Sequence, residues 1–131
     1  MKPKPISTSE APAAIGAYSQ AMLVRGLSVS PLLFTSGQVA LDLNGHMVGD
    51  GDVVLETEQV LKNLNAVLSA AGVFKSGVIR ATIYLTSMDD FSKVNEVYGA
   101  YFGEHKPARA CVAVAALPKG AKVEIDFVAI K

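Results

Sequence analysis

The stretch PARACVAVAALPKGAKVEID, residues 107–126, decides how the last third of the chain folds. Its small and β-branched residues predict a strand over about 108–116, and the residues that follow predict another over about 123–130. The connecting LPKGAK contains a proline and a glycine, which are typical of a turn. We therefore expect the two strands to form a hairpin at the end of the chain.

The register of this hairpin determines which polar side chains meet. If Leu117 pairs with Lys122, then Arg109, Cys111 and Glu124 lie on one face of the sheet. A slip of one residue would separate them, because neighbouring positions of a strand face opposite ways.

These three side chains allow specific chemistry, and each also has a plain structural interpretation. Arg109 could hold a carboxylate with its planar fork, or lie at the surface in a weak ion pair. Glu124 stands in an apolar stretch, where burial would raise its pKa and suit acid–base work, or it pairs with Lys122. Cys111 has no histidine near it in the sequence, so a compact apolar wall is favoured over a nucleophile.

The remaining pattern predicts an α+β domain with a two-layer arrangement. Strands are expected near 22–24 and 32–35, joined by a loose connection through Gly26, and over 78–86, with room for one more strand at the start. Apolar residues at helical spacing predict helices over 52–71 and up to 102. Two helices would cover one face of a mixed sheet.

Local signals mark the ends of these elements. Asp52 is a helix cap and Gly72 a helix stop, Ser87 with Asp90 resembles a capping box, and Gly103 ends the second helix. The segment 78–86 alternates, so Val78, Arg80, Thr82 and Tyr84 should face one way and Ile79, Ala81, Ile83 and Leu85 the other.

The composition indicates association with other copies. A chain of 131 residues is one ordinary domain, yet half of its residues are hydrophobic and only 18% are charged, against about 25% in typical domains. A small domain buries a limited share of its surface, so part of this excess should lie between subunits. A tightly packed monomer with apolar patches is the alternative.

Charge and leader signals restrict the partners and the location. The net charge is zero, which makes nucleic acid an unlikely partner. No apolar run reaches the roughly 20 residues that span a bilayer, and the first residues lack a secretory core. We expect a cytoplasmic protein without membrane contact, with mitochondrial association left open. His46 and His105 have no metal-ligand partners at usable spacing, and both are expected at the surface.

Three further residues are candidates for a ligand site. Ser36 lies in TSGQ at a strand end, Asn95 lies one turn from Phe91 on the second helix, and Tyr18 lies in the loop GAYSQA. Each of them could line a pocket. The alternatives are that Ser36 is an ordinary turn residue, Asn95 a solvated amide and Tyr18 a packed aromatic.

Several quoted stretches together resemble the reactive intermediate deaminase (Rid) family, and its RidA subfamily in particular. They are APAAIGAYSQA, FTSGQVA, DDFSKVNEVYGAYF and PARACVAVAALPKGAKVEID. The resemblance covers residues 1–131 in order. It implies a chorismate-mutase-like fold and a homotrimer with three clefts between subunits.

The resemblance also implies an activity and a set of site residues. The activity is hydrolysis of reactive enamines and imines, such as 2-aminoacrylate, 2-iminobutanoate and 2-iminopropanoate, to 2-oxo acids and ammonia, without metal or cofactor. Arg109 resembles the family's carboxylate-binding arginine, and Glu124 resembles the residue that activates water. Tyr18, Ser36, Asn95 and Cys111 resemble pocket-lining positions. Ala17 departs from the family's usual proline before the tyrosine.

Two other functions remain open at this stage. Some members of the family are associated with endoribonuclease or translation-inhibitor activity, against which the neutral charge argues. Others keep the fold without deaminase activity, so a carboxylate-metabolite sensor or a chaperone-like trimer is the second alternative.

Overall fold

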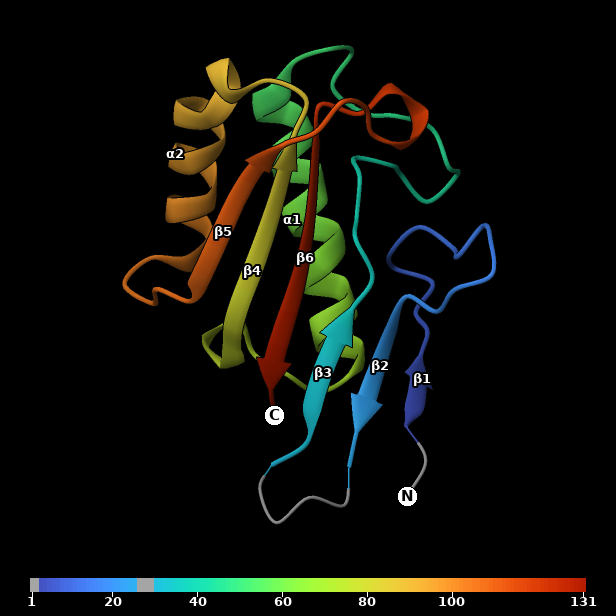
Figure 1. The fold of residues 1–131 in the computed structure, drawn as a ribbon. Helices are drawn as coiled ribbons and strands as arrows, with labels where there is room; N and C mark the ends of the chain where they lie inside the picture. The colour runs from blue at the N-terminus through green and yellow to red at the C-terminus, as the bar shows by residue number, and fades with distance from the viewer. Residues whose placement is uncertain (1–2, 26–29) are drawn as a thin grey trace.

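The computed structural model describes residues 3–25 and 30–131, which form a mixed six-stranded sheet with two α-helices on one face (Figure 1). The predicted α+β two-layer architecture is therefore confirmed. The strands are β1 (Lys4–Ile6), β2 (Ala21–Val24), β3 (Leu32–Thr35), β4 (Val78–Leu85), β5 (Ala108–Ala113) and β6 (Val123–Ile130). The helices are α1 (Val53–Ala70) and α2 (Phe91–Phe102).

The order of strands corrects the predicted C-terminal hairpin. The sheet runs β1-β2-β3-β6-β4-β5, with β4 and β5 parallel and the other pairs antiparallel. Because β4, α2 and β5 form a crossover unit, β5 takes the edge beside β4. The chain then turns at Pro118–Gly120 and returns through the middle of the sheet as β6 (Figure 1). β5 and β6 are thus not neighbours, and the hairpin prediction is wrong.

Two strand details also differ from the prediction. β5 ends at Ala113 instead of residue 116, because its only partner strand ends at Leu85, opposite Ala113. In β4 a bulge between Val78 and Arg80 turns Val78 inward, while Ile79 is 46% exposed. The predicted alternation holds from Arg80 onward, since a bulge shifts the facing of the residues before it.

Most of the predicted helix ends are confirmed. The Asp52 carboxylate accepts hydrogen bonds from the backbone N–H groups of Val54 and Leu55, at 2.9 and 3.4 Å. Gly72 and Gly103 adopt positive φ just beyond α1 and α2. Ser87 caps a 3₁₀ turn before α2, and no side-chain bond returns from Asp90, so the capping box is only half formed. The connection through Gly26 lies outside the described residues.

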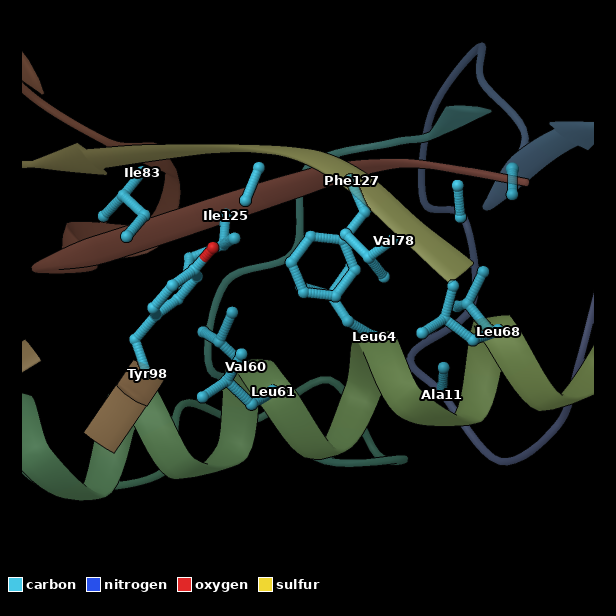
Figure 2. Close-up of a cluster of buried hydrophobic side chains, with 14 of the residues drawn as sticks. Ala11, Val60, Leu61, Leu64, Leu68, Val78, Ile83, Tyr98, Ile125 and Phe127 are labelled. Atoms are coloured by element: carbon cyan, nitrogen blue, oxygen red, sulfur yellow. The ribbon is translucent and has the colours of Figure 1, made fainter. Parts of the chain in front are cut away.

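The core lies between the sheet and α1. Figure 2 shows Leu64 and Leu68 of α1 beneath Val78 of β4 and Phe127 of β6. Every second residue of β6 from Val123 to Ala129 is at most 1% exposed, so β6 is the central strand of this layer. Since these inward positions are apolar, the polar residues of β6 face the uncovered side of the sheet.

Candidate active site

A cavity of about 340 Å³ lies beside β6 and contains three of the predicted site residues. We call it the Glu124 cavity. Its polar wall holds Tyr18, Ser36 and Glu124, and its other walls are formed by Ile15, Gly37, Val39, Leu41, Pro118 and Lys119. The segment containing Val39 and Leu41 is fastened to α1, because the Asn63 amide donates to both of their carbonyls.

Glu124 packs directly against the backbone of Gly37. A Cβ at Gly37 would lie 2.6 Å from Oε2 of Glu124 and 2.8 Å from its Cδ. Burial raises the pKa of the Glu124 carboxyl, and the charge of Asp126 raises it further. A carboxyl with a raised pKa is a stronger base once it is ionised, which suits general acid–base chemistry.

Ser36 and Tyr18 present oxygen atoms to this cavity in defined roles. The Ser36 hydroxyl donates its proton to the Ser19 carbonyl. Its remaining lone pairs can therefore only accept, so it suits an N–H or O–H donor. The Tyr18 hydroxyl accepts a hydrogen bond from the backbone N–H of Ile15 at 3.3 Å, which leaves its own proton free to donate. The cavity thus combines a carboxylate with one acceptor and one donor.

Arg109 and Asn95 lie together in a second cavity, of about 460 Å³, which we call the Arg109 pocket. Nη1 of Arg109 donates to Oδ1 of Asn95 at 2.6 Å, and the guanidinium carbon lies 5.0 Å from the Tyr98 ring centroid. One nitrogen is used in this way, and the rest of the planar fork can bind an anion. His105 also lines the pocket and is partly buried, with Nε2 2.7 Å from the Val78 carbonyl.

Cys111 lies on the same side of the sheet as Arg109, two residues along β5. Its side chain is half-buried and packs against the core. Burial raises the pKa of the Cys111 thiol, while the Arg109 charge lowers it. A thiol with a raised pKa is a poor nucleophile, so the geometry favours the interpretation of Cys111 as a wall.

The two cavities are on opposite faces of the sheet, which corrects the predicted grouping. Arg109 is opposite Ala81 and faces the helices, whereas Glu124 is opposite Tyr84 and faces the uncovered side. The prediction that Arg109, Cys111 and Glu124 share one face is therefore wrong for Glu124. The error follows from the hairpin, because β6 pairs with β4 and not with β5.

Sequence reasoning missed Gly37 and Gln20. Gly37 follows Ser36 in TSGQ, but its role depends on a contact with Glu124, 87 residues later, that local patterns do not encode. Gln20 lies two residues after Tyr18, and its side chain is only 4% exposed. The sequence signal for this burial is weak, because it consists only of the position of Gln20 just before an apolar strand.

Metal-binding clusters and membrane-spanning helices are two further features that bear on function. Within residues 3–25 and 30–131, no group of three or more His, Cys, Asp or Glu side chains could hold a metal ion. In the same ranges, no helix is long and apolar enough to cross a membrane.

The fold and the two cavities define a small α+β protein with a carboxylate in one cavity and an arginine with a mostly uncommitted guanidinium in the other. The family model described as Endoribonuclease L-PSP matches residues 8–131. The chain belongs to this family, and the Rid-family prediction is confirmed.

Three relatives illustrate the range of the family. Protein DfrA of Myxococcus xanthus is 50% identical over 130 residues, covering 99% of this chain and 97% of the relative. The rat 2-iminobutanoate/2-iminopropanoate deaminase is 46% identical over 128 residues, covering 98% and 90%. The crystal structure of Escherichia coli TdcF with bound serine superposes with a TM-score of 0.86 at 38% identity, covering 98% of each chain.

Proposed function

We propose that this protein hydrolyses 2-imino acids and their enamine tautomers, such as 2-iminobutanoate, 2-iminopropanoate and 2-aminoacrylate, to 2-oxo acids and ammonia. The observation that carries the proposal is that one chain presents two reactive groups. Glu124 is a half-buried carboxyl of raised pKa, and Arg109 has a guanidinium that is mostly free to bind an anion. Two comparisons support it. A relative of 46% identity is named as such a deaminase, and another relative binds serine, which carries a carboxylate beside an amino group as the substrates do.

The chemistry requires positioning and proton transfer more than strong activation. The imine carbon is electrophilic, so a water oxygen bonds to it while Glu124 takes one proton of that water. Glu124 returns this proton to the nitrogen as the C=N double bond opens, which gives a carbinolamine. Glu124 then takes the proton of the new hydroxyl and delivers it to the same nitrogen, so the C–N bond breaks, the carbonyl forms and ammonia leaves. Arg109 holds the carboxylate, and Ser36 accepts a hydrogen bond from the imine nitrogen or the water. Tyr18 donates a hydrogen bond, Asn95 orients Arg109, and Cys111 forms a wall.

Arg109 and Glu124 belong to one reaction site only if two copies of the chain meet. The uncovered face of the sheet favours such an assembly, because Phe34 and Val112 on it are each 44% exposed. We propose that the 131 residues form a single Rid-family domain and that three copies form a ring. Each cleft of the ring then combines the Glu124 cavity of one copy with Arg109 of the next.

A trapping assay tests the activity. An amino-acid oxidase supplies the imino acid, semicarbazide traps what remains, and the protein should suppress the trapped product. Arg109→Ala and Glu124→Gln should each abolish this suppression. Binding of a carboxylate by the wild type without turnover would favour the sensor alternative, and cleavage of RNA with loss of activity in Glu124→Gln would favour the ribonuclease alternative.

Mixing the two inactive variants tests the shared cleft. When Arg109→Ala and Glu124→Gln subunits are unfolded, mixed equally and refolded together, about a quarter of the clefts should receive both intact residues. Deaminase activity should then return to that extent. A site within one chain predicts no recovery, so an inactive mixture of confirmed mixed trimers would refute the shared cleft.

A further inference from the structure

The loop that carries Tyr18 has little apolar packing to hold it. Residues 13–18 are exposed along their whole length, whereas Ala11 and Gln20 at the two ends are only 3% and 4% exposed. Ile15 and Tyr18 of this loop nevertheless form one side of the Glu124 cavity. A segment with so few buried contacts opens easily unless specific hydrogen bonds fix it.

The side chain of Gln20 supplies such bonds. Its Oε1 accepts a hydrogen bond from the backbone N–H of Thr8 at 2.6 Å. Its Nε2 donates to the carbonyls of Pro12 at 2.7 Å, Thr8 at 3.1 Å and Ala11 at 3.4 Å. One side-chain amide thereby joins the start of β2 to both sides of the tight turn in residues 8–12. Both the oxygen and the nitrogen of the amide are hydrogen-bonded.

The backbone of Gln20 extends the same connection to Ser36, which also lines the cavity. Its carbonyl accepts a hydrogen bond from the Ser36 N–H at 2.9 Å, and the Ser36 hydroxyl donates to the carbonyl of Ser19. The loop 13–19 is therefore fixed where it leaves Pro12, where it reaches Gln20, and beside Ser36. Ala17 makes this fixing important, because an alanine restricts the backbone less than a proline would.

We propose that Gln20 is a positioning residue, whose side-chain amide fixes the loop 13–19 so that Ile15 and Tyr18 close one side of the Glu124 cavity. Gln20 does not touch the reacting atoms and acts through the loop. The inference rests on the proposed function, because the Glu124 cavity is taken as the place of reaction.

Hydrogen exchange of the intact wild-type assembly and of Gln20→Glu tests the fixing without reference to activity. The ionised glutamate keeps the length of the side chain and can accept from Thr8, but it cannot donate to the three carbonyls. The amides of Ile15 and Tyr18, which are hydrogen-bonded within the loop, should exchange at least tenfold faster in the variant, while those of α1 stay unchanged. Thr8→Ser is the control, since it keeps the backbone groups that Gln20 binds and the hydroxyl that accepts from the Glu10 N–H, and it should exchange like the wild type.

Gln20→Met keeps the experiment decisive if a buried glutamate prevents folding. It preserves chain length without adding a charge, and it should speed exchange in the loop and at Thr8, whose N–H loses its acceptor, but not in α1. Unchanged exchange in the loop would overturn the proposal. Unfolding of both variants would also overturn it, because Gln20 would then support the core and not the loop.

Kinetics then test whether the loop acts through Tyr18. Gln20→Glu should lower kcat/KM for 2-iminobutanoate about tenfold. In a Tyr18→Ala background the same substitution should cost less than about twofold, because the wall it positions is already lost. Equal losses in both backgrounds would overturn the inference. If the wild type turned over no imino acid, the proposed function would fail, while the exchange data would still decide the role of Gln20.

Discussion

Substituting Gly37 by alanine should strongly lower the proposed deaminase activity without removing any reactive group. Gly37 has no positive φ, so alanine is compatible with the backbone. The added methyl carbon would, however, lie 2.6 Å from Oε2 of Glu124. The carboxylate must retreat by about 0.8 Å to reach an ordinary contact of 3.4 Å. A misplacement of about 1 Å at a reacting group can cost about 100-fold in rate, so kcat/KM should fall by 10- to 100-fold.

The protein should remain folded, because Glu124 is only half-buried and can rotate toward solvent. Leaving its preferred rotamer costs about 0.5–1.5 kcal/mol, and urea unfolding should show a loss no larger than this. Rotation would also return the carboxyl to water and remove the burial that raises its pKa. The acid limb of the pH–rate profile should therefore move to lower pH than in the wild type.

Gly99→Ala is the matched control for this experiment. It adds the same methyl group in α2, where no side chain and no other element of the described residues lies within 4 Å of the new carbon. Alanine in a helix should add about 0.5–1 kcal/mol of stability, and because Gly99 lines the Arg109 pocket and not the Glu124 cavity, the acid limb should stay at its wild-type pH. Wild-type kcat/KM in Gly37→Ala, with an unmoved acid limb, would refute the argument that Glu124 acts from its contact with Gly37.

Three further predictions follow from the same geometry. The hydroxyl of Tyr98 is buried without a hydrogen-bond partner, so Tyr98→Phe should stabilise the protein by about 1 kcal/mol in urea unfolding, and a loss of stability would show a partner for the hydroxyl. The pKa of Glu124 is raised, so from its ordinary value of 4.5 upward the folded chain binds more protons than the unfolded one, and the free energy of unfolding should fall as pH rises through this window. Glu124→Gln should reduce that fall, and an unchanged pH dependence would contradict the raised pKa. Asn95→Ala removes the 2.6 Å partner of Arg109, so KM for 2-iminobutanoate should rise about tenfold without a shift of the acid limb, and an unchanged KM would show that Asn95 does not orient the arginine.

The secondary structure was predictable because its signals are local. Asp52, Gly72 and Gly103 mark helix ends by their own chemistry, and the structure confirms each of them. The order of strands was not predictable in the same way, because pairing of β6 with β3 and with β4 joins segments about 95 and about 45 residues apart, respectively. A hairpin is the shortest connection that the sequence allows, and the crossover unit β4-α2-β5 overrides it.

The candidate site was predictable as a set of residues but not as a geometry. Motif resemblance identified Tyr18, Ser36 and Glu124, which do line one cavity, and Arg109 with Asn95, which line another. The side of the sheet on which each residue lies depends on the register of strand pairing. Alternation along a strand shows which residues share a face, but it does not show which face that is until the neighbouring strand is known. Close approach, as at Gly37, likewise depends on the tertiary fold.

The separation of Arg109 from Glu124 has a physical cause in the central position of β6. A central strand beneath a helix fills its inward positions with apolar side chains, so a reactive carboxyl on β6 must face the uncovered side. In an edge strand such as β5, the positions that face the helices need not all be apolar, so Arg109 can lie on the helix side against Asn95. In the proposed trimer a second copy would cover Glu124, and that cover would remove further water from a carboxyl whose pKa burial already raises. Assembly would thus complete the site and adjust its acid–base residue in one step.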